Sequence, residues 1–207
     1  MKKVFLFRHG QTDWNKSERF HGHADIALNS TGYAQAKRLL PILSAHQLEL
    51  IISSDLKRAF QTAQTIATPL SIPVEMTPEL REAHIGQAQG LTRHEIVNRF
   101  GASLTDQWRS VHPSHLHARY PDGESGQEVI DRVFGFLNQT LLTRPETRIG
   151  LCTHGGVIRR IMQALLPSLK QAVPIPNGIV YLIEYHPKDR RWNVAHYFEI
   201  VQPKSLP

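Results

Sequence analysis

Cysteine is nearly absent from this sequence, because Cys152 is the single cysteine among 207 residues. One thiol excludes a disulfide framework within the chain and is typical of a reducing compartment, and we expect Cys152 to be an inert buried thiol. The apolar run at residues 4–7 is too short for the apolar region of a signal peptide and far too short to span a bilayer. We therefore expect a cytoplasmic protein that has no membrane association.

The sequence also lacks internal repeats, low-complexity tracts and Gly/Ser-rich linkers. Its 207 residues, of which 41% are hydrophobic and 20% are charged, are enough to bury one sizeable core. We expect residues 1–207 to form a single domain, present as a monomer or a homodimer.

Nucleic-acid-binding features are missing in spite of a net charge of +6. Lys and Arg are scattered, with only short pairs such as Arg159-Arg160 and Arg190-Arg191, and no basic run is interleaved with aromatic residues. Two interpretations remain, a solvated basic surface or several arginines that serve a small anionic substrate. We favour the second, which predicts a small-molecule partner and no nucleic acid.

The sequence does contain a regular alternation of strand-like and helix-like segments. Apolar runs that predict strands lie at residues 3–7, 49–53, 148–152 and 179–183. Helical patterns lie at residues 30–46, 55–68, 125–142 and 155–166, and the third begins with the capping box Ser125-x-x-Glu128. This alternation predicts an α/β fold with three α/β/α layers and a mostly parallel central sheet.

Charged and imidazole side chains follow three of the predicted strands. Arg8 and His9 follow the first strand, Arg58 lies shortly after the second, and His154 follows the third. The ligand site of an open α/β sheet lies beyond the carboxyl ends of its strands. We therefore expect these two histidines and two arginines to meet at one edge of the sheet.

Two arginines that meet at one point suit a phosphate, which accepts paired hydrogen bonds from guanidinium groups. Arg58 lies in the first turn of its predicted helix, so the amide groups of that turn add to the site. The positive charges of Arg8 and Arg58 lower the pKa of His9, and a neutral imidazole is a competent nucleophile. His154 is then placed to hydrogen-bond the phosphoryl oxygens in the transition state.

A proton donor for the leaving group is expected in the segment that contains Glu82, where Gly86 and Gly90 indicate an irregular wall of a cleft. Glu75 and Glu79 are competing carboxylates. A surface ion pair with Arg81 is the alternative interpretation of Glu82.

Six motifs occur in a fixed order along nearly the whole chain. They are Arg8-His9-Gly10-Gln11-Thr12-x-Trp14-Asn15, Gly22-x-x-Asp25-x-x-Leu28-x-x-x-Gly32, Ser53-x-Asp55-Leu56-x-Arg58-Ala59-x-x-Thr62-Ala63, Leu80-Arg81-Glu82-x-x-x-Gly86, Gly123-Glu124-Ser125 and Thr153-His154-Gly155-Gly156. Together they resemble the histidine phosphatase superfamily, in the branch that includes cofactor-dependent phosphoglycerate mutases and broad-specificity phosphatases.

This resemblance implies a covalent phosphohistidine at His9, a proton donor at Glu82, and neither a metal nor a cofactor. It implies a helical or loop lid over the substrate at about residues 84–122. The phosphate contacts that it implies come from Arg8, Asn15, His21, Gly22, Arg58, His154 and Gly155, with residues 21–22 contributing through their backbone.

Three activities are compatible with the resemblance. A mutase must hold the carboxylate of a phosphoglycerate, but Ile85 and Ser110 occupy positions where the mutases have carboxylate-binding groups. Water is then the natural acceptor, so we predict hydrolysis of a small phosphate monoester. The alternatives are a cofactor-dependent phosphoglycerate mutase and a non-catalytic relative that binds phosphorylated ligands.

A histidine-rich tract lies within the predicted lid, at His112, His115 and His117. Imidazole is a common metal ligand, but no acidic or thiolate residue accompanies these histidines in the tract. A contact between one of them and the substrate is the better interpretation, because binding residues are frequent in loops.

The sequence predicts catalysis without a metal ion. Arg8, Arg58 and His154 already supply the positive charge and hydrogen-bond donors that a metal would bring to phosphoryl transfer. We expect phosphatase activity to be unchanged after dialysis against EDTA. A loss of activity that zinc or magnesium restores would contradict this prediction and would direct attention to the histidine-rich tract.

Overall fold

The protein is built on one six-stranded sheet, described here from a computed structural model that covers residues 1–168 and 173–198. The order of the strands across the sheet is β3-β2-β4-β1-β5-β6. Their bounds are β1 Lys2–Arg8, β2 Leu50–Ser54, β3 Val74–Thr77, β4 Arg148–Thr153, β5 Val180–His186 and β6 Arg191–Phe198. The four strand segments expected from the sequence are therefore confirmed as β1, β2, β4 and β5.

The sheet is mixed, with a parallel part and an antiparallel edge. β1 pairs in parallel with β4, β4 with β2, and β2 with β3. β5 runs antiparallel to β1 and forms a hairpin with β6. The expectation of a mostly parallel sheet is thus confirmed for the part that carries the predicted site residues.

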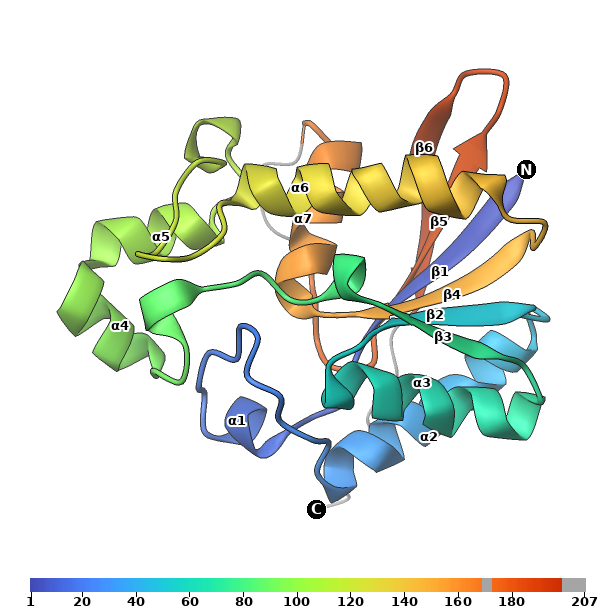
Figure 1. Ribbon diagram of the computed structural model, residues 1–207, viewed down its shortest axis with the longest axis horizontal. Helices are drawn as coiled ribbons and strands as arrows, with labels where there is room; N and C mark the ends of the chain where they lie inside the picture. The colour runs from blue at the N-terminus through green and yellow to red at the C-terminus, as the bar shows by residue number, and fades with distance from the viewer. Residues whose placement is uncertain (169–172, 199–207) are drawn as a thin grey trace, which may run out of the picture.

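Seven α-helices occur in the described residues (Figure 1). They are α1 Asp13–Lys16, α2 Ser30–Ser44, α3 Lys57–Leu70, α4 Arg93–Phe100, α5 Ala102–Arg109, α6 Gly126–Gly135 and α7 Gly155–Leu165. Short 3₁₀ turns lie at Pro78–Leu80, Gly86–Ala88, Pro113–His115 and Leu141–Thr143, and the π-helical turn Phe136–Thr140 extends α6. The helix expected at residues 125–142 is therefore present, but it changes its hydrogen-bonding pattern after Gly135.

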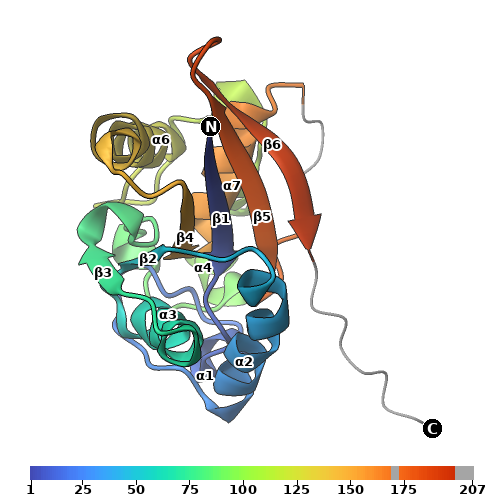
Figure 2. The ribbon, with the colours of Figure 1, turned by 90° about the vertical axis from the view of Figure 1, so that its right-hand side faces the viewer.

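The helices cover both faces of the sheet, as the expected three layers require (Figures 1 and 2). Side chains alternate along a strand, so β1 directs Val4 and Leu6 to one face and Phe5 and Phe7 to the other. The first pair belongs to the hydrophobic cluster that contains α6 and α7, and the second pair packs with α2 and α3. β1 is consequently buried on both sides, which explains its continuous apolar sequence.

Two close contacts at the carboxyl end of β1 fix the start of α2. A side chain at Gly10 would place its Cβ 2.3 Å from the carbonyl oxygen of Gly32, so only glycine permits this approach. Asn29 caps α2 by accepting a hydrogen bond from the Gly32 amide at 2.9 Å. The loop that follows His9 is therefore pressed against the first turn of α2.

Five strands and helices were not delimited from the sequence, namely β3, β6, α1, α4 and α5. β3 is a four-residue edge strand with partly exposed side chains, and β6 is an edge strand with several charged or polar residues. The stability of such edge strands comes from pairing and packing with neighbouring strands more than from an apolar pattern in their own sequence. α4 and α5 lie inside the expected lid at residues 84–122 and form a pair at the left of Figure 1.

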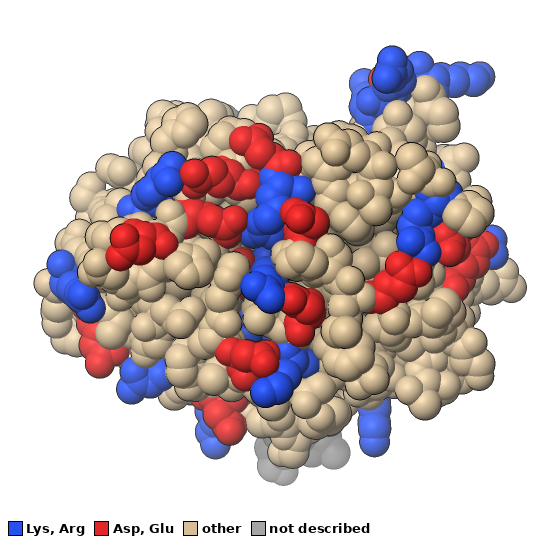
Figure 3. All heavy atoms as spheres, in the orientation of Figure 1, with Lys and Arg blue, Asp and Glu red and all other residues tan. Residues whose placement is uncertain are grey.

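Acidic and basic side chains alternate on the face of the molecule seen in Figure 3. On that face the positive charges do not join into a continuous stripe. Within the described residues, no helix is both long and apolar enough to cross a bilayer.

Candidate active site

A cavity of about 620 Å³ opens at the carboxyl ends of β1 and β4, beside the first turn of α7. Most of the residues expected at the site line this cavity, namely Arg8, His9, Asn15, His21, Gly22, Glu82 and Gly155. The other two, Arg58 and His154, are fully buried and do not form its surface. Both are electrostatically coupled to His9, so the structure brings the predicted groups together.

His9 lies directly after β1 and is almost completely buried. Its Nδ1 is 2.7 Å from the carbonyl oxygen of Gly10, and a carbonyl can only accept a hydrogen bond. Nδ1 therefore carries the proton of the neutral ring. The lone pair of Nε2 is left free to attack an electrophile.

Arg8 and Arg58 are held in place by backbone carbonyl groups. Arg8 donates from Nη1 to the Ile175 oxygen at 2.6 Å. Arg58 donates from Nη1 to the Ala24 oxygen at 2.7 Å and from Nη2 to the Gly22 oxygen at 2.9 Å. The Nε atom of each arginine is buried and has no hydrogen-bond partner among residues 1–168 and 173–198, so each guanidinium is held in place and retains a donor that the described residues do not use.

His154 contributes a third unused donor. Its Nε2 is 2.8 Å from Ser54 Oγ, and its Nδ1 is buried with no partner in the described part of the chain. Ser54 Oγ accepts the Leu56 amide at 3.3 Å, so its own hydroxyl proton is available to His154 Nε2. With Nε2 as acceptor, the ring proton of His154 lies on Nδ1.

The three donors, which the described residues leave unpaired, are Arg8 Nε, Arg58 Nε and His154 Nδ1. Buried donors normally have partners, so three such donors near one another indicate a site for an anion.

The imidazoles of the site are neutral, and the arginines are charged. Burial lowers the pKa of His9 well below its ordinary 6.5, and the nearby charges of Arg58 and Arg8 lower it further. The pKa of His154 is lowered well below 6.5 by burial and then by Arg58 and His9. Burial also lowers the pKa values of Arg8 and Arg58, each to about 10, so both keep their charge at neutral pH.

Glu82 lines the same cavity. Its Oε1 accepts the amide of Ala83 at 2.9 Å, and its Oε2 accepts the amide of Gly156, in the first turn of α7, at 3.0 Å. A Cβ atom at Gly156 would lie 2.3 Å from Glu82 Oε1, so glycine is required for this contact. The alternative interpretation of Glu82 as a surface partner of Arg81 is wrong, because Arg81 pairs with Asp55 at 2.6 Å.

Asn15 and His21 are tied to one another through Thr12. Asn15 Oδ1 accepts the Thr12 amide at 3.1 Å, which leaves the Asn15 amide nitrogen as the group that can donate to a ligand. His21 Nε2 lies 2.6 Å from Thr12 Oγ1, and the His21 ring also hydrogen-bonds the backbone of Arg19. His21 thus braces the loop through both ring nitrogens, and its neighbour Gly22 lines the cavity.

Sequence reasoning missed several arginines that line the cavity, namely Arg19, Arg93, Arg109 and Arg159. Arg159 belongs to the pair Arg159-Arg160, in which the Arg159 Nε is buried and Arg160 is only 4% exposed. The pair is therefore not part of a solvated basic surface, the interpretation that we did not favour from the sequence. Spacing could have found it, because Arg159 follows Gly155 by four residues and therefore lies on the same face of α7.

Arg160 fixes the segment that follows α5. It donates to the carbonyl groups of Trp108 and Ser110, the latter at 2.8 Å, and to Gln163 Oε1 at 2.7 Å. Trp108 and Arg109 line the cavity directly before this attachment. Residues of the expected lid therefore contribute to the wall of the site.

The histidine-rich tract lies elsewhere. His112, His115 and His117 do not line the cavity, and His112 Nδ1 is 2.7 Å from Ser114 Oγ. Among residues 1–168 and 173–198, no three His, Cys, Asp or Glu side chains are grouped so that they could hold a metal ion. Cys152 is buried, as expected, and burial raises the pKa of its thiol.

These observations describe an α/β protein with a positively charged cavity at the carboxyl edge of its sheet, lined by a neutral imidazole. A profile of the histidine phosphatase superfamily (branch 1) matches residues 4–198. The chain belongs to this superfamily, which confirms the resemblance drawn from the six sequence motifs.

Relatives match over nearly the whole chain. It is 33% identical over 201 residues to phosphoglycerate mutase-like protein 4 of Arabidopsis thaliana, covering 96% of this chain and 85% of the relative. It is 28% identical to the uncharacterized phosphatase PhoE of Bacillus subtilis, covering 95% and 94% of the two chains. A solved structure, the mycobacterial glucosyl-3-phosphoglycerate phosphatase with VO₃, is similar at a TM-score of 0.79 and 29% identity, over 94% and 98% of the chains.

The neutral state of His21 predicts a dependence of stability on pH. Burial, with Arg58 and Arg8, lowers the pKa of His21 to about 3, whereas an unfolded histidine titrates near 6.5. Between these pH values the unfolded chain binds one more proton at this residue, so the free energy of unfolding falls as the pH falls. We expect unfolding of His21→Gln to take up about one proton fewer than unfolding of the wild type between pH 4 and 5.5. Its free energy of unfolding, measured with urea, should therefore change less steeply with pH in this range. Equal slopes in both proteins would contradict the prediction.

Proposed function

We propose that this protein is a phosphomonoester hydrolase that acts on a small phosphorylated metabolite through a covalent phosphohistidine at His9. The observation that carries the proposal is the free Nε2 of a neutral His9 together with three buried donors for which the described residues supply no acceptor. A phosphoryl group has oxygens for these donors and a phosphorus atom for the imidazole. The names of PhoE and of the mycobacterial enzyme, both phosphatases, support the proposal.

The first step transfers the phosphoryl group to the enzyme. The lone pair of His9 Nε2 forms a bond to phosphorus, and the bond from phosphorus to the ester oxygen breaks. The carboxylic acid of Glu82 gives its proton to the leaving oxygen, which departs as an alcohol. The free donors of Arg8, Arg58 and His154 hold the phosphoryl oxygens as charge shifts during this transfer.

The second step transfers the phosphoryl group to water. The carboxylate of Glu82 accepts a proton from water while the water oxygen bonds to phosphorus and the phosphorus–nitrogen bond breaks. Inorganic phosphate leaves, and His9 and Glu82 return to their starting states. The amides of Ala83 and Gly156 keep the Glu82 carboxyl group in one place during both steps.

A mutase is the second candidate, and one observation favours it. Arg93, Arg109 and Arg159 line the same cavity as His9, so the wall beyond the phosphate site has more positive charge than the sequence suggested. Such a wall would attract a carboxylate on the substrate. Water remains our proposed acceptor, because Ile85 brings an apolar side chain to this cavity and Ser110 does not line it.

The positively charged wall supports a further proposal about the substrate. Because Arg93, Arg109 and Arg159 lie beyond the phosphate site, we propose that the substrate carries a second negative group besides its phosphate.

A non-catalytic role in binding phosphorylated ligands is less well supported. The nucleophile, the carboxyl group and the phosphate-binding groups are all present and lie around one site. The location of the protein in the cytoplasm, its oligomeric state and the absence of nucleic-acid or membrane partners stay predictions from the sequence.

The phosphohistidine can be tested directly. Rapid quenching with ³²P-labelled substrate should trap an adduct that is labile in acid and stable in base, as expected of a phosphorus–nitrogen bond. His9→Ala removes the nucleophile and should abolish both the adduct and turnover. An adduct that persists in His9→Ala would overturn the mechanism.

The choice between phosphatase and mutase can be made with one substrate. We expect release of phosphate from 3-phosphoglycerate to be faster than formation of 2-phosphoglycerate, because water is the proposed acceptor. A coupled enolase assay follows the isomerisation, and a phosphate assay follows the hydrolysis. Isomerisation faster than hydrolysis would reverse the assignment.

A further inference from the structure

We propose that Arg132 of α6, paired with Glu124, is a positioning residue that holds the proton donor Glu82 in place. The inference rests on the proposed function, since it assigns a role relative to the general acid. Glu82 lies in an irregular segment between the 3₁₀ turns Pro78–Leu80 and Gly86–Ala88, so neither a helix nor a strand fixes its backbone. The amides of Ala83 and Gly156 hold its carboxyl group, but the backbone that carries Glu82 needs a further support to keep the side chain within reach of them.

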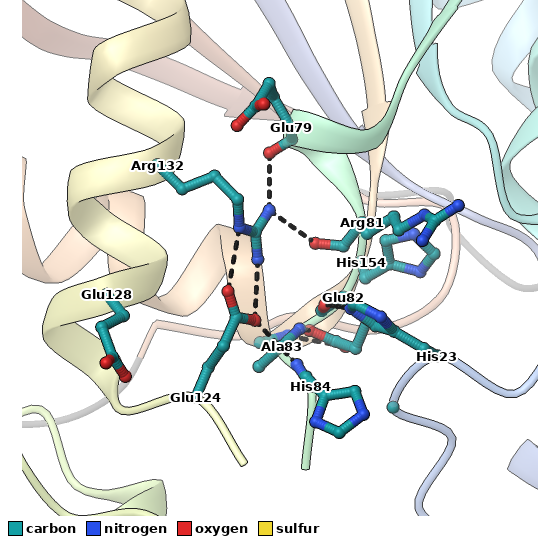
Figure 4. A network of polar contacts seen from close by, with 12 residues as sticks. His23, Glu79, Arg81, Glu82, Ala83, His84, Glu124, Glu128, Arg132 and His154 are labelled. Carbon is teal, nitrogen blue, oxygen red and sulfur yellow. Dashed lines mark hydrogen bonds and ion pairs between the residues drawn. The ribbon is translucent and has the colours of Figure 1, made fainter. Parts of the chain in front are cut away.

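Arg132 supplies that support from the side of the sheet covered by α6 (Figure 4). Its Nη1 donates to the carbonyl oxygens of Glu79 at 2.6 Å and Arg81 at 3.2 Å. Its Nε and Nη2 donate to the two carboxylate oxygens of Glu124 at 3.1 and 3.0 Å. One guanidinium group thus joins α6, Glu124 and the backbone immediately before Glu82.

Glu124 holds the backbone on the other side of Glu82. Its Oε2 accepts the amide of His84 at 2.8 Å, and its own amide donates to the His84 carbonyl at 2.6 Å. The carbonyl of Glu82 itself accepts a hydrogen bond from His23 Nε2 at 2.8 Å. The backbone is therefore attached directly before, at and directly after the proposed proton donor.

The ion pair between Arg132 and Glu124 is largely buried, which strengthens its hold on the backbone around Glu82. The side chains of Arg132 and Glu124 are only 18% and 23% exposed, and they meet through two parallel hydrogen bonds. Removal of one partner would leave a largely buried charge and several backbone groups unpaired. The segment that contains Glu82 would then relax, whereas His9, Arg8 and Arg58 are held by other contacts.

The contacts that hold Glu82 are separate from those that hold His9, Arg8 and Arg58. Loss of the positioning role should therefore change the rates with two phosphate esters to different extents. An alkyl phosphate needs a proton on its leaving oxygen, while p-nitrophenolate leaves well without one. Displacement of Glu82 should therefore slow phosphorylation of His9 by an alkyl phosphate and have little effect with p-nitrophenyl phosphate. A general loss of folding would slow both reactions equally.

The experiment compares Arg132→Met with Glu82→Gln, which removes the acid, and with the control Arg144→Met. Arg144 also makes a bidentate ion pair, with Glu75 at 2.6 Å, but it lies before the start of β4, at the end of that strand opposite His154. Phosphoenzyme formation is measured in single turnovers with both phosphate esters. Circular dichroism and urea unfolding show the folded fraction of each variant.

We expect Arg132→Met to slow the alkyl phosphate about 10²-fold, as misplaced catalytic groups do, and p-nitrophenyl phosphate less than about threefold. Glu82→Gln should show the same selectivity, and Arg144→Met should show none. If Arg132→Met does not fold, Glu124→Gln, which keeps the size of the side chain, should show a smaller loss with the same selectivity.

Two negative outcomes are distinguishable. Equal losses on both esters in Arg132→Met and Glu124→Gln, with selective loss in Glu82→Gln, would overturn the positioning role and leave the proposed function intact. Equal losses in Glu82→Gln would instead remove the acid role of Glu82, and the positioning role with it. In that case the phosphohistidine assay at His9 still tests the hydrolase.

Discussion

The burial of two guanidinium groups beside a neutral imidazole is the constraint on which the rest of this structure depends. Burying an isolated charge is costly unless hydrogen bonds or an opposite charge replace the lost water. Backbone carbonyls provide part of this compensation, from Ile175 to Arg8 and from Ala24 and Gly22 to Arg58. Within the described residues the Nε donors of both arginines have no acceptor, and an opposite charge that acts on both arginines is Glu82. The same arrangement keeps His9 unprotonated and thus nucleophilic.

The parallel pairing of β1 with β4 sets the distance between the two buried imidazoles. Arg8 is in register with Thr153, so the next residues of the two strands, His9 and His154, leave the sheet at the same level. Their ring centroids are 5.1 Å apart. A one-residue slip of either strand would exchange the side chains that pack on the two faces of the sheet, and the two hydrophobic clusters differ in their residues. The hydrophobic core therefore fixes the distance between His9 and His154.

Much of this arrangement could be predicted from the sequence, because it depends on local patterns. The apolar strands β1, β2 and β4 carry their polar residues directly after them, so the position of His9, Arg58 and His154 follows from the fold class. Arg132 could not be placed in this way, since its role depends on contacts between segments far apart in the chain. The edge strands β3 and β6 were missed for a related reason, namely that neighbouring strands stabilise them more than their own composition does.

The arginines also explain why a basic composition need not indicate a basic binding surface. Arg8, Arg58, Arg132 and Arg160 each donate to backbone carbonyls of irregular segments near the cavity. A guanidinium group has five donors in a rigid plane, so it can join several carbonyl groups and still keep a donor for a ligand or a carboxylate. Lysine, with a single flexible ammonium group, could not make the same set of contacts. In this fold the loops around the cavity are therefore ordered by the same residue type that gives the cavity its positive charge, which ties the shape of the cavity to its charge.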